Sequence, residues 1–403
     1  MEILIKRIAV IGGGRWAKVI TEEICDILSK NIIISIHSLS NHKNFSKWVK
    51  QKNFQQKIIV NKNLPNFSNE NIDAAFIVNA ARDHEKYVKI CLNAGVPTLV
   101  EKPITLASST TEKLISIANE KGKILASSHV FLFADYLKNF LGYINVKQIN
   151  HIQIDWIDSK SEVRYGEKKT YDYGLPIYLD CLPHILSIIN RLIPDKNWDF
   201  KNLNLMGGGS KLEIEMSVGR IPCFIIIQRN GNDRIRYIRI NHSKTTELDF
   251  SNEPGYIISK GENTNADINW GLNMRPLKKM ISCFIKSVSV GKVDNRLSPH
   301  LGLRINNFID KLKDEYRNQM SIWLSKMLKP ELIPDENIVY ALKEIFSFKA
   351  YIPIDILEKN IKNILKSIKD DLSVDLINQL HSNDNIIDNL ETLFINEIKS
   401  DNN

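Results

Sequence analysis

The sequence predicts an α/β protein in three parts: a parallel sheet with helices on both faces, an antiparallel sheet, and a helical C-terminal extension. Three successive patterns along the 403 residues support this prediction. Short β-branched runs alternate with helical patterns up to about residue 130, as in parallel sheets. Apolar residues then recur at every second position, and from about residue 317 at helical spacing. We therefore predict domains at 1–130 and 131–316, and an extension at 317–403.

In the first part, short apolar runs are the predicted strands. They lie at 8–11, 32–36, 74–78, 98–100 and 124–127. Helical patterns lie between them, at 17–28, 84–93 and 108–121. Strands that alternate with helices over short links pair in parallel, because each crossover returns the chain to the same edge of the sheet.

In the second part, the two-residue period predicts an antiparallel sheet with one wet face. Ile152, Ile154 and Trp156 point one way along a predicted strand, and the polar residues between them point the other way. Further strands are predicted at 212–218, 221–228, 234–240 and 246–250, and helices at 180–192, 277–290 and 301–316. In the extension, apolar residues form two helical stripes, which comprise Leu357, Ile361, Ile364, Ile368 and Leu372, and then Ile387, Leu390, Phe394 and Ile398.

Composition argues against several classes of protein. The net charge is +8, but no basic run exceeds two residues and acidic residues are interspersed, so we expect neither a nucleic-acid partner nor a membrane partner. The five cysteines are far apart and form no CxxC pair, so we expect no disulfide framework and no metal site. No apolar run approaches the ~18 residues of a membrane helix. We expect a cytoplasmic protein.

The first chemical motif is Gly12-Gly13-Gly14-Arg15-Trp16-Ala17, which fits GxGxxA between a predicted strand and a predicted helix. The glycines permit a tight turn and let the backbone approach a pyrophosphate, and the helix N-terminus offers free N–H groups to the phosphates. Ala17 is the small residue that close helix–strand packing requires. The motif favours a dinucleotide site, with cofactor contacts at Gly12, Gly14, Arg15, Trp16 and Ala17, over a simple turn.

The end of the second predicted strand bears on the choice of dinucleotide. An acidic residue there would bind the ribose 2′-hydroxyl of NAD, but the sequence continues Ile36-His37-Ser38 and then to Lys43 without one. Hydroxyl groups, imidazole and ammonium suit a 2′-phosphate better. The sequence therefore favours NADP over NAD, with Ser38 as a contact. The alternative is an ordinary solvent-exposed loop.

The third motif, Glu101-Lys102-Pro103, lies at a strand end, where doubly wound sheets bind ligands. A lysine at this place can donate a hydrogen bond to a substrate hydroxyl and stabilise developing negative charge. Taken alone, the tripeptide also fits an ordinary surface loop.

The fourth motif pairs Asp180 with His184, which share one face of the predicted helix at 180–192. Pro183 is tolerated only in a first turn, so we expect Asp180 near the cap and His184 near the positive helix end. The helix dipole would then keep the imidazole neutral, as a general base requires. The alternative is a capping aspartate with a packed or exposed histidine.

These motifs together resemble the glucose–fructose oxidoreductase / inositol dehydrogenase / rhizopine-catabolism (Gfo/Idh/MocA) family of NAD(P)-dependent oxidoreductases. The resemblance covers roughly residues 5 to 315 and is most specific over 72–131. The stretches that carry it are Ile72 to Val78 with His84, Cys91 to Val96, Val100 to Ile104, Ala118 to Gly122, Ser128 to Phe131, and the D-x-x-x-H pair Asp180 and His184.

The resemblance implies a Rossmann domain, an α/β domain with an open, mostly antiparallel sheet, and the cofactor between them. It also implies that Lys102 polarises the substrate oxygen, that His184 exchanges the proton, and that Asp180 positions the substrate or the imidazole. Hydride would pass between nicotinamide C4 and the substrate carbon. Further cofactor contacts are expected at Asn79, His84, Glu101 and Lys102, and the residues expected to shape the substrate pocket are His129, Trp156, Arg164 and Tyr165.

The sequence departs from the family pattern in the loop at 79–84, which lacks the usual proline, and at Ile188, where a second aspartate is common. The extension lies beyond the usual family length, and it would cap the site, mediate oligomerisation or dock a protein partner. The leading hypothesis is an NAD(P)-dependent oxidoreductase, expected as a homo-oligomer, that acts on a sugar, polyol or related hydroxy/keto small molecule. The alternatives are a non-catalytic dinucleotide-binding regulator or scaffold and an imine (C=N) reductase.

Overall fold

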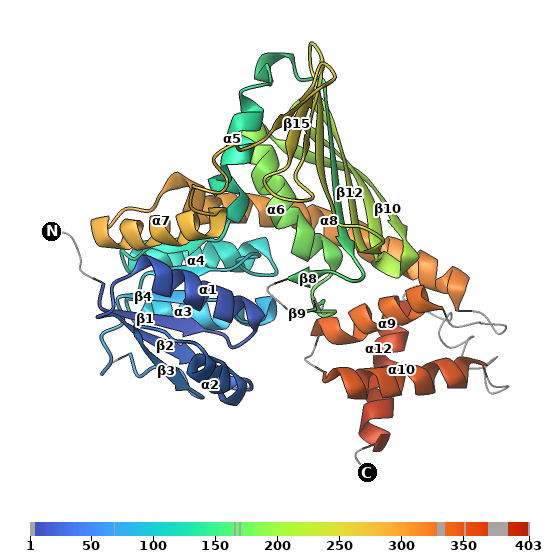
Figure 1. Ribbon diagram of the computed structural model, residues 1–403. Helices are drawn as coiled ribbons and strands as arrows, with labels where there is room; N and C mark the ends of the chain where they lie inside the picture. The colour runs from blue at the N-terminus through green and yellow to red at the C-terminus, as the bar shows by residue number, and fades with distance from the viewer. Residues whose placement is uncertain are drawn as a thin grey trace. The chain divides into compact units, whose positions relative to one another are not determined.

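The computed structural model describes residues 5–67, 69–164, 167–168, 171–328, 335–349, 352–369 and 386–401 (Figure 1). The chain divides into two compact units. Unit 1 comprises Met1–Tyr143, Leu182–Asp195 and Asn265–Asp310, and unit 2 comprises Ile144–Cys181, Lys196–Thr264 and Lys311–Asn403. Two helices, α6 (Ile177–Leu192) and α8 (Pro299–Met327), run across the division. The domain limits expected at 130 and 316 stay predictions.

Unit 1 contains a sheet of strand order β3-β2-β1-β4-β5-β6, in which every neighbouring pair is parallel. The predicted doubly wound parallel sheet is therefore confirmed. Its strands are β1 (Arg7–Ile11), β2 (Ile33–His37), β3 (Lys57–Asn61), β4 (Ala74–Ile77), β5 (Thr98–Val100) and β6 (Leu125–Ser127). The sequence analysis missed the edge strand β3 and the helix α2 (His42–Gln51), of which Phe45 is the one fully buried residue.

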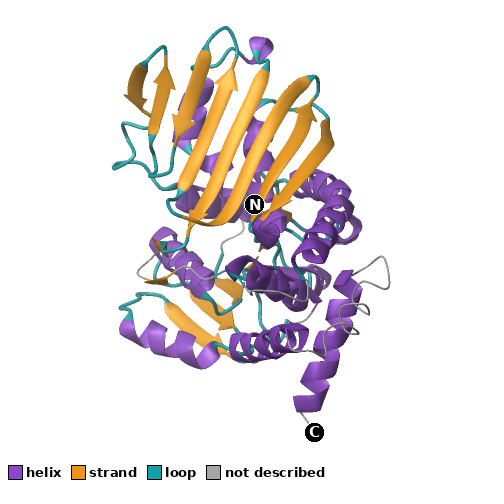
Figure 2. Ribbon diagram, turned by 90° about the vertical axis from the view of Figure 1, so that its right-hand side faces the viewer, coloured by secondary structure: helices purple, strands orange, loops and turns teal. Residues whose placement is uncertain are grey.

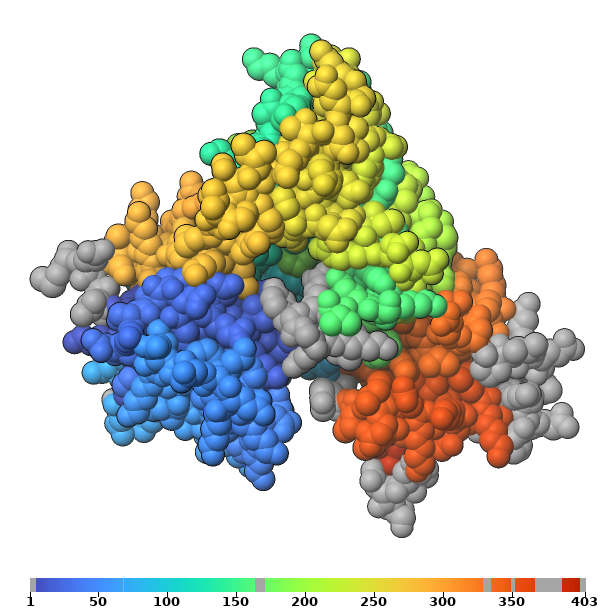
Figure 3. Space-filling view, in the orientation of Figure 1, coloured from blue at the N-terminus to red at the C-terminus, as the bar shows by residue number. Residues whose placement is uncertain are grey.

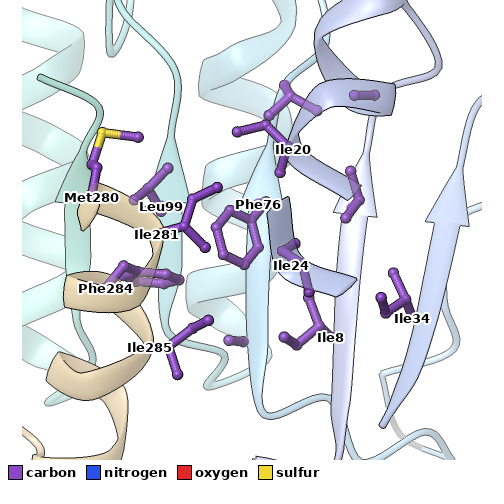
Figure 4. Packing of buried hydrophobic residues seen from close by; sticks show 14 of the residues in the cluster. Ile8, Ile20, Ile24, Ile34, Phe76, Leu99, Met280, Ile281, Phe284 and Ile285 are labelled. Atoms are coloured by element: carbon purple, nitrogen blue, oxygen red, sulfur yellow. The ribbon is translucent and has the colours of Figure 1, made fainter. Parts of the chain in front are cut away.

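Helices cover both faces of this sheet. Successive residues of each strand point to opposite faces, so each strand packs against helices on both sides. On one face, Ile8 and Val10 pack with α1 (Arg15–Ile27) and α7 (Pro276–Val290) (Figure 4). On the other face, Ala9 and Ile11 pack with α3 (His84–Asn93) and α4 (Ser108–Glu120). The sequence analysis places the helix at 277–290 in the second domain, whereas α7 packs its apolar side on the first sheet.

Unit 2 contains an eight-stranded sheet of order β10-β11-β12-β7-β13-β14-β15-β16 (Figure 2). The β12–β7 pair is parallel, and the other neighbouring pairs from β10 to β15 are antiparallel. The expected mostly antiparallel sheet is therefore confirmed. Its strands are β7 (His151–Ser159), β10 (Trp198–Met206), β11 (Lys211–Val218), β12 (Ile221–Gly231), β13 (Ile235–Asn241), β14 (Thr245–Asp249), β15 (Tyr256–Ser259) and β16 (Glu262–Asn265).

Helix α6 begins at Ile177, three residues before the predicted start at Asp180. Pro183 therefore lies inside the helix and not in its first turn, so the predicted position of this proline is wrong. The apolar residues Ile177 to Leu179, which precede Asp180, are all buried and lengthen the helix towards its N-terminus. His184 consequently lies about two turns from the helix start.

The described part of the extension is helical, as predicted. It consists of the end of α8, then α9 (Glu336–Lys349), α10 (Ile354–Lys369) and α12 (Ile386–Asp401), which are orange to red in Figure 3. The rings of Phe346 and Phe394 stack with their centroids 4.0 Å apart. The predicted stripe residues Leu357, Ile361, Ile364, Ile387, Leu390 and Phe394 are buried. Leu372 and the side chain of Ile368 lie outside the described residues.

Across the described segments, no helix is both long enough and apolar enough to span a bilayer.

The packing of α7 on the first sheet can be tested at Phe284, which is fully buried and meets Phe76 edge-on with ring centroids 5.2 Å apart. Phe284→Ala should lower the free energy of unfolding by about 3–5 kcal/mol, because it removes buried apolar surface and leaves a cavity. Urea denaturation measures this change. Lys286→Ala on the exposed side of the same helix is the control, and equal stabilities of the two variants would contradict the packing.

Candidate functional site

The glycine motif forms a turn that holds three strands together. Gly12 directly follows β1, and its N–H donates to the carbonyl oxygen of His37 at 3.0 Å. Its φ is +141°, and a Cβ added there would lie 2.8 Å from the carbonyl carbon and oxygen of Val78. A Cβ on Gly13 would overlap the Ser38 hydroxyl and lie 2.6 Å from the Ser38 Cβ. This turn therefore excludes side chains at its first two positions.

The turn leads into an open helix N-terminus. Gly14 is the N-cap of α1, carries no capping side chain, and would have no atom within 4 Å of an added Cβ. The first turn contains no acidic residue, and its first residue is Arg15. The first N–H groups of a helix have no partner within the helix and carry partial positive charge. This end of α1 therefore fits the pyrophosphate of a dinucleotide, with Trp16 and the buried Ala17 on the next positions.

At the end of β2, the polar groups expected to meet a 2′-phosphate have partners within the protein. The Ser38 hydroxyl accepts a hydrogen bond from the Asn41 N–H at 3.2 Å. The Nδ1 atom of His37 lies 2.6 Å from the carbonyl oxygen of Asn63, and burial lowers the pKa of this histidine. Lys43 is exposed in the first turn of α2. The role of Ser38 towards NADP stays a prediction.

The Glu101-Lys102 pair follows β5, and the glutamate is 8% exposed. Glu101 Oε1 accepts from the Ser128 hydroxyl at 2.8 Å, and Oε2 accepts from the Lys102 N–H at 3.3 Å. Burial raises the pKa of Glu101, while hydrogen bonds from Trp16 and Ser128 and the charge of Lys102 oppose this rise. Glu101 thus links the backbone of Lys102 to Trp16 in the first turn of α1 and to Ser128 in the loop after β6.

His84 joins the loop after β4 to the loop after β5. Its Nδ1 lies 2.7 Å from the carbonyl oxygen of Pro103 and its Nε2 lies 3.1 Å from that of Asn79. His84 is 1% exposed, and burial lowers its pKa. The Oδ1 atom of Asn79 is buried and has no hydrogen-bond partner among the described residues, so it can accept from a bound cofactor.

Two further predicted site residues of unit 1 are histidines. His129 follows β6 and is 2% exposed, and burial lowers its pKa to about 4, so its imidazole is neutral. His184 is half-buried on α6, and the ring of Phe131 meets it edge-on with centroids 5.1 Å apart. The helix dipole acts within the first turn, so it does not reach His184 in the way the sequence analysis predicts.

The loops after β1, β4, β5 and β6 gather at one edge of the parallel sheet, since these strands are neighbours and run in the same direction. Unit 1 thereby contains the predicted cofactor residues together with Lys102, His129 and His184. They are Gly12, Gly14, Arg15, Trp16, Ala17, Ser38, Asn79, His84, Glu101, Lys102, His129 and His184.

The remaining predicted site residues belong to unit 2. Trp156 is 3% exposed and packs between the Arg236 guanidinium, 4.1 Å from its ring centroid, and Phe250, and its role in a substrate pocket stays a prediction. Arg164 ends the short strand β8 (Val163–Arg164), and its side chain lies outside the described residues, as does Tyr165. The Asp180 carboxylate accepts from Arg229 at 3.2 Å.

Sequence reasoning missed Arg229, which lies near the end of β12 and is 1% exposed. Besides Asp180, its guanidinium donates to the carbonyl oxygen of Leu175 at 2.8 Å and to the Tyr340 hydroxyl at 3.1 Å. The two-residue period of β12 could have predicted its burial, because Arg229 follows the inward-pointing residues Cys223, Ile225 and Ile227 at the same spacing. An arginine at an inward strand position signals a buried ionic partner.

Glu344, on α9, belongs to the same buried cluster. Its carboxyl group accepts from the hydroxyl of Tyr316 and, at 3.4 Å, from that of Tyr340. Glu344 is 3% exposed, and burial raises its pKa to about 7. The hydroxyls and the charge of Arg229 oppose this rise.

Within the described segments, no three histidine, cysteine, aspartate or glutamate side chains cluster in a way that could hold a metal ion.

Comparison with known proteins agrees with the glycine turn and the strand-end loops. Residues 6–129 match the Gfo/Idh/MocA family, described as an oxidoreductase family with an NAD-binding Rossmann fold. Biliverdin reductase A of Homo sapiens is 37% identical over 68 residues, which are 17% of this chain and 23% of that protein. UDP-N-acetylglucosamine 3-dehydrogenase of Acidithiobacillus ferrooxidans is 36% identical over 59 residues, which are 15% of this chain and 19% of that protein.

Solved structures extend the similarity of fold to both units. A structure of the Acidithiobacillus ferrooxidans dehydrogenase gives a TM-score of 0.63 at 15% identity and covers 79% of this chain and 100% of that chain. The K102E variant of a 3-ketoreductase from Actinomadura kijaniata, solved with NADP, gives a TM-score of 0.61 at 14% identity. The comparison covers 77% of this chain and 98% of that chain.

The fold and the site define a two-domain α/β protein with an NAD-binding Rossmann domain. Residues 6–129, which are less than half of the chain, match the Gfo/Idh/MocA oxidoreductase family, in agreement with the resemblance drawn from the sequence. The matched segments span less than a quarter of the curated relatives, between 18% and 23% of their length.

The raised pKa of Glu344 gives a test of the buried cluster. The folded state holds this proton up to a pH of about 7, whereas an ordinary glutamate loses it near 4.5. Glu344 therefore contributes up to about 3 kcal/mol of stability below pH 4.5, and the contribution disappears as the pH rises through 7. Glu344→Gln, which stays neutral, should reduce the fall in Tm between pH 5 and pH 8.

Glu336→Gln is the matched control, because Glu336 lies on the same helix with its side chain 79% exposed. Its Tm should follow the wild-type pH dependence. Parallel pH profiles for wild type and Glu344→Gln would contradict the assignment.

Proposed function

We propose that the protein is an NAD(P)-dependent oxidoreductase that moves hydride between nicotinamide and a hydroxyl- or carbonyl-bearing carbon of a sugar, polyol or related compound. The observation that carries the proposal is the convergence of the loops after β1, β4, β5 and β6 at one sheet edge. These loops supply an open helix N-terminus for the pyrophosphate and an ammonium group at Lys102. The family match over residues 6–129 supports it.

The proposed chemistry divides into hydride and proton transfer. NAD(P) supplies or accepts the hydride when it is bound. Lys102 donates a hydrogen bond to the substrate oxygen and stabilises its negative charge in the transition state. His184 gives a proton to that oxygen in reduction and removes one in oxidation, with its ring held edge-on by Phe131. Asp180, fixed by Arg229, positions the substrate or the imidazole.

The cofactor we propose is NADP. Support comes from the absence of an acidic residue at the end of β2, where NAD-binding domains use one for the ribose hydroxyls. The exposed Lys43 in the next helix offers a charge for a 2′-phosphate. The NADP complex of the Actinomadura kijaniata ketoreductase supports the same choice.

The substrate class we favour is a nucleotide-linked sugar. Two relatives are named for reactions at carbon 3 of such sugars: UDP-N-acetylglucosamine 3-dehydrogenase and, from Streptomyces violaceoruber, dTDP-3,4-didehydro-2,6-dideoxy-alpha-D-glucose 3-reductase. The match to biliverdin reductase A at 37% identity supports biliverdin as a second candidate. Turnover of a panel of nucleotide-linked keto-sugars and of biliverdin, each with NADPH and with NADH, separates the two.

Gly13 and Gly14 form a matched pair for testing cofactor binding. Gly14→Ala should fold with a loss of about 1 kcal/mol or less, because its added Cβ meets no protein atom, yet weaken NADPH binding at least about tenfold by occupying the phosphate position. Gly13→Ala should lower the Tm by several degrees, since its Cβ overlaps Ser38. Thermal unfolding and NADPH fluorescence titration measure both effects. Unchanged NADPH affinity in Gly14→Ala would exclude a pyrophosphate at this turn.

Substitutions at Lys102 and His184 test the proposed chemistry. Lys102→Met and His184→Ala should each lower kcat about 100-fold or more, because these groups act on the reacting oxygen and its proton, and His184→Ala should leave NADPH affinity nearly unchanged. Steady-state kinetics on the best substrate of the panel supplies kcat. The exposed Lys113 and His300 of unit 1 provide the controls Lys113→Met and His300→Ala. Undiminished turnover in both Lys102→Met and His184→Ala would disprove the assigned roles.

A further inference from the structure

The first turns of α6 have an interrupted hydrogen-bond ladder. Pro183 lies inside this helix and has no N–H, so the carbonyl oxygen of Leu179 loses its normal helical donor. Asp180 lies on the N-terminal side of this interruption, and His184 directly follows it. The Asp180 N–H still donates to the carbonyl oxygen of Pro176 at 3.1 Å, and contacts from outside the helix add to this bond.

Arg229 supplies these contacts. One guanidinium nitrogen donates both to the carbonyl oxygen of Leu175, which precedes the helix, and to the carboxylate of Asp180, at 2.8 Å and 3.2 Å. The ring of Tyr171 lies against the same guanidinium, at 5.0 Å from its centroid. Arg229 thus holds the entry to α6 at a backbone oxygen and at a side chain.

The extension helix α9 in turn holds Arg229. The second terminal nitrogen of Arg229 donates to the Tyr340 hydroxyl at 3.1 Å, and that hydroxyl donates to Glu344 at 3.4 Å. Tyr340 also meets Tyr173, in the segment before α6, edge-on with centroids 5.8 Å apart. The Lys343 ammonium lies over the ring of Tyr173, 5.1 Å from its centroid.

The seat of α9 is closely fitted. The turn at Gly207–Gly209 lies against this helix and against α8. A Cβ on Gly208 would overlap the carbonyl oxygen of Asn337, and one on Gly209 would overlap the Tyr316 hydroxyl. Tyr316 reaches the same glutamate as Tyr340, so α8 and α9 converge on one buried carboxyl group. These contacts leave α9 little freedom to shift relative to Arg229.

We propose that α9 positions the first turn of α6 through Arg229, with Arg229 and Tyr340 as positioning residues for Asp180. The extension is then part of the machinery that orients the D-x-x-x-H pair, and not only a surface for partners. The structural claim, that α9 holds the turn of Asp180 through Arg229, rests on contacts within unit 2 alone. The catalytic part rests on the proposed oxidoreductase function.

The test compares full-length Tyr340→Phe, Arg229→Lys and Arg229→Met with the exposed control Glu336→Gln. Hydrogen–deuterium exchange of peptides within 171–186 reports the first turn of α6, and peptides within 7–27 report the glycine turn. Tyr340→Phe and Arg229→Met should speed exchange in 171–186 at least fivefold and leave 7–27 unchanged. Arg229→Lys should restore part of the protection, because it keeps the charge and one donor.

Kinetics then test the consequence for catalysis. With active sites counted by NADPH titration, Tyr340→Phe should lower kcat about tenfold while the Kd for NADPH stays within twofold of wild type. A defect in folding alone would reduce the number of sites and leave kcat per site unchanged. Should Arg229→Met fail to fold, Tyr340→Phe, which removes a single oxygen atom, still decides the question.

The proposal is overturned if Tyr340→Phe matches Glu336→Gln in the exchange of 171–186, or if exchange rises while kcat per site is unchanged. Failure of the proposed function gives a different result. The wild-type chain would then neither bind NADPH nor turn over the substrate panel, and the exchange measurement would still decide whether α9 positions α6.

Discussion

The close approach of Gly12 to Val78 is the constraint on which the candidate site depends. A Cβ at this position would lie 2.8 Å from the Val78 carbonyl, so only glycine lets β1 turn directly into α1 beside β4. This turn leaves the N-terminus of α1 open at the sheet edge where the loops after β4, β5 and β6 also end. The positions of Asn79, Glu101 and Lys102 follow from the parallel order of these strands, and the hydrogen bonds of His84 and Ser128 fix them.

Local pattern was sufficient to predict most of the first sheet and the alternation of the second, because both place apolar residues at regular spacing. It failed where few residues are buried: α2 fully buries only Phe45, and β3 is a half-buried edge strand. It also misplaced the start of α6. Asp180 with Pro183 has the pattern of a helix N-terminus, yet the helix begins at Ile177. The contacts of Arg229 around this turn come from distant parts of the chain.

The Arg229 cluster shows why the rest of the site was beyond local reasoning. Its partners Asp180 and Tyr340 are 49 and 111 residues away along the chain, so no short pattern contains them. A buried guanidinium without partners would cost several kcal/mol, which makes the cluster a strong constraint on the fold of unit 2. The same cluster gives the C-terminal extension a direct link to the helix of Asp180 and His184.

A crystal structure of the full chain with NADP and a substrate or inhibitor would test the central claim most directly. The account predicts the pyrophosphate against the backbone N–H groups of Gly14 and Arg15, with the Lys102 ammonium and the His184 ring both in contact with the bound small molecule. A dinucleotide bound away from the glycine turn, or a Lys102 and His184 that face different ligands, would contradict it.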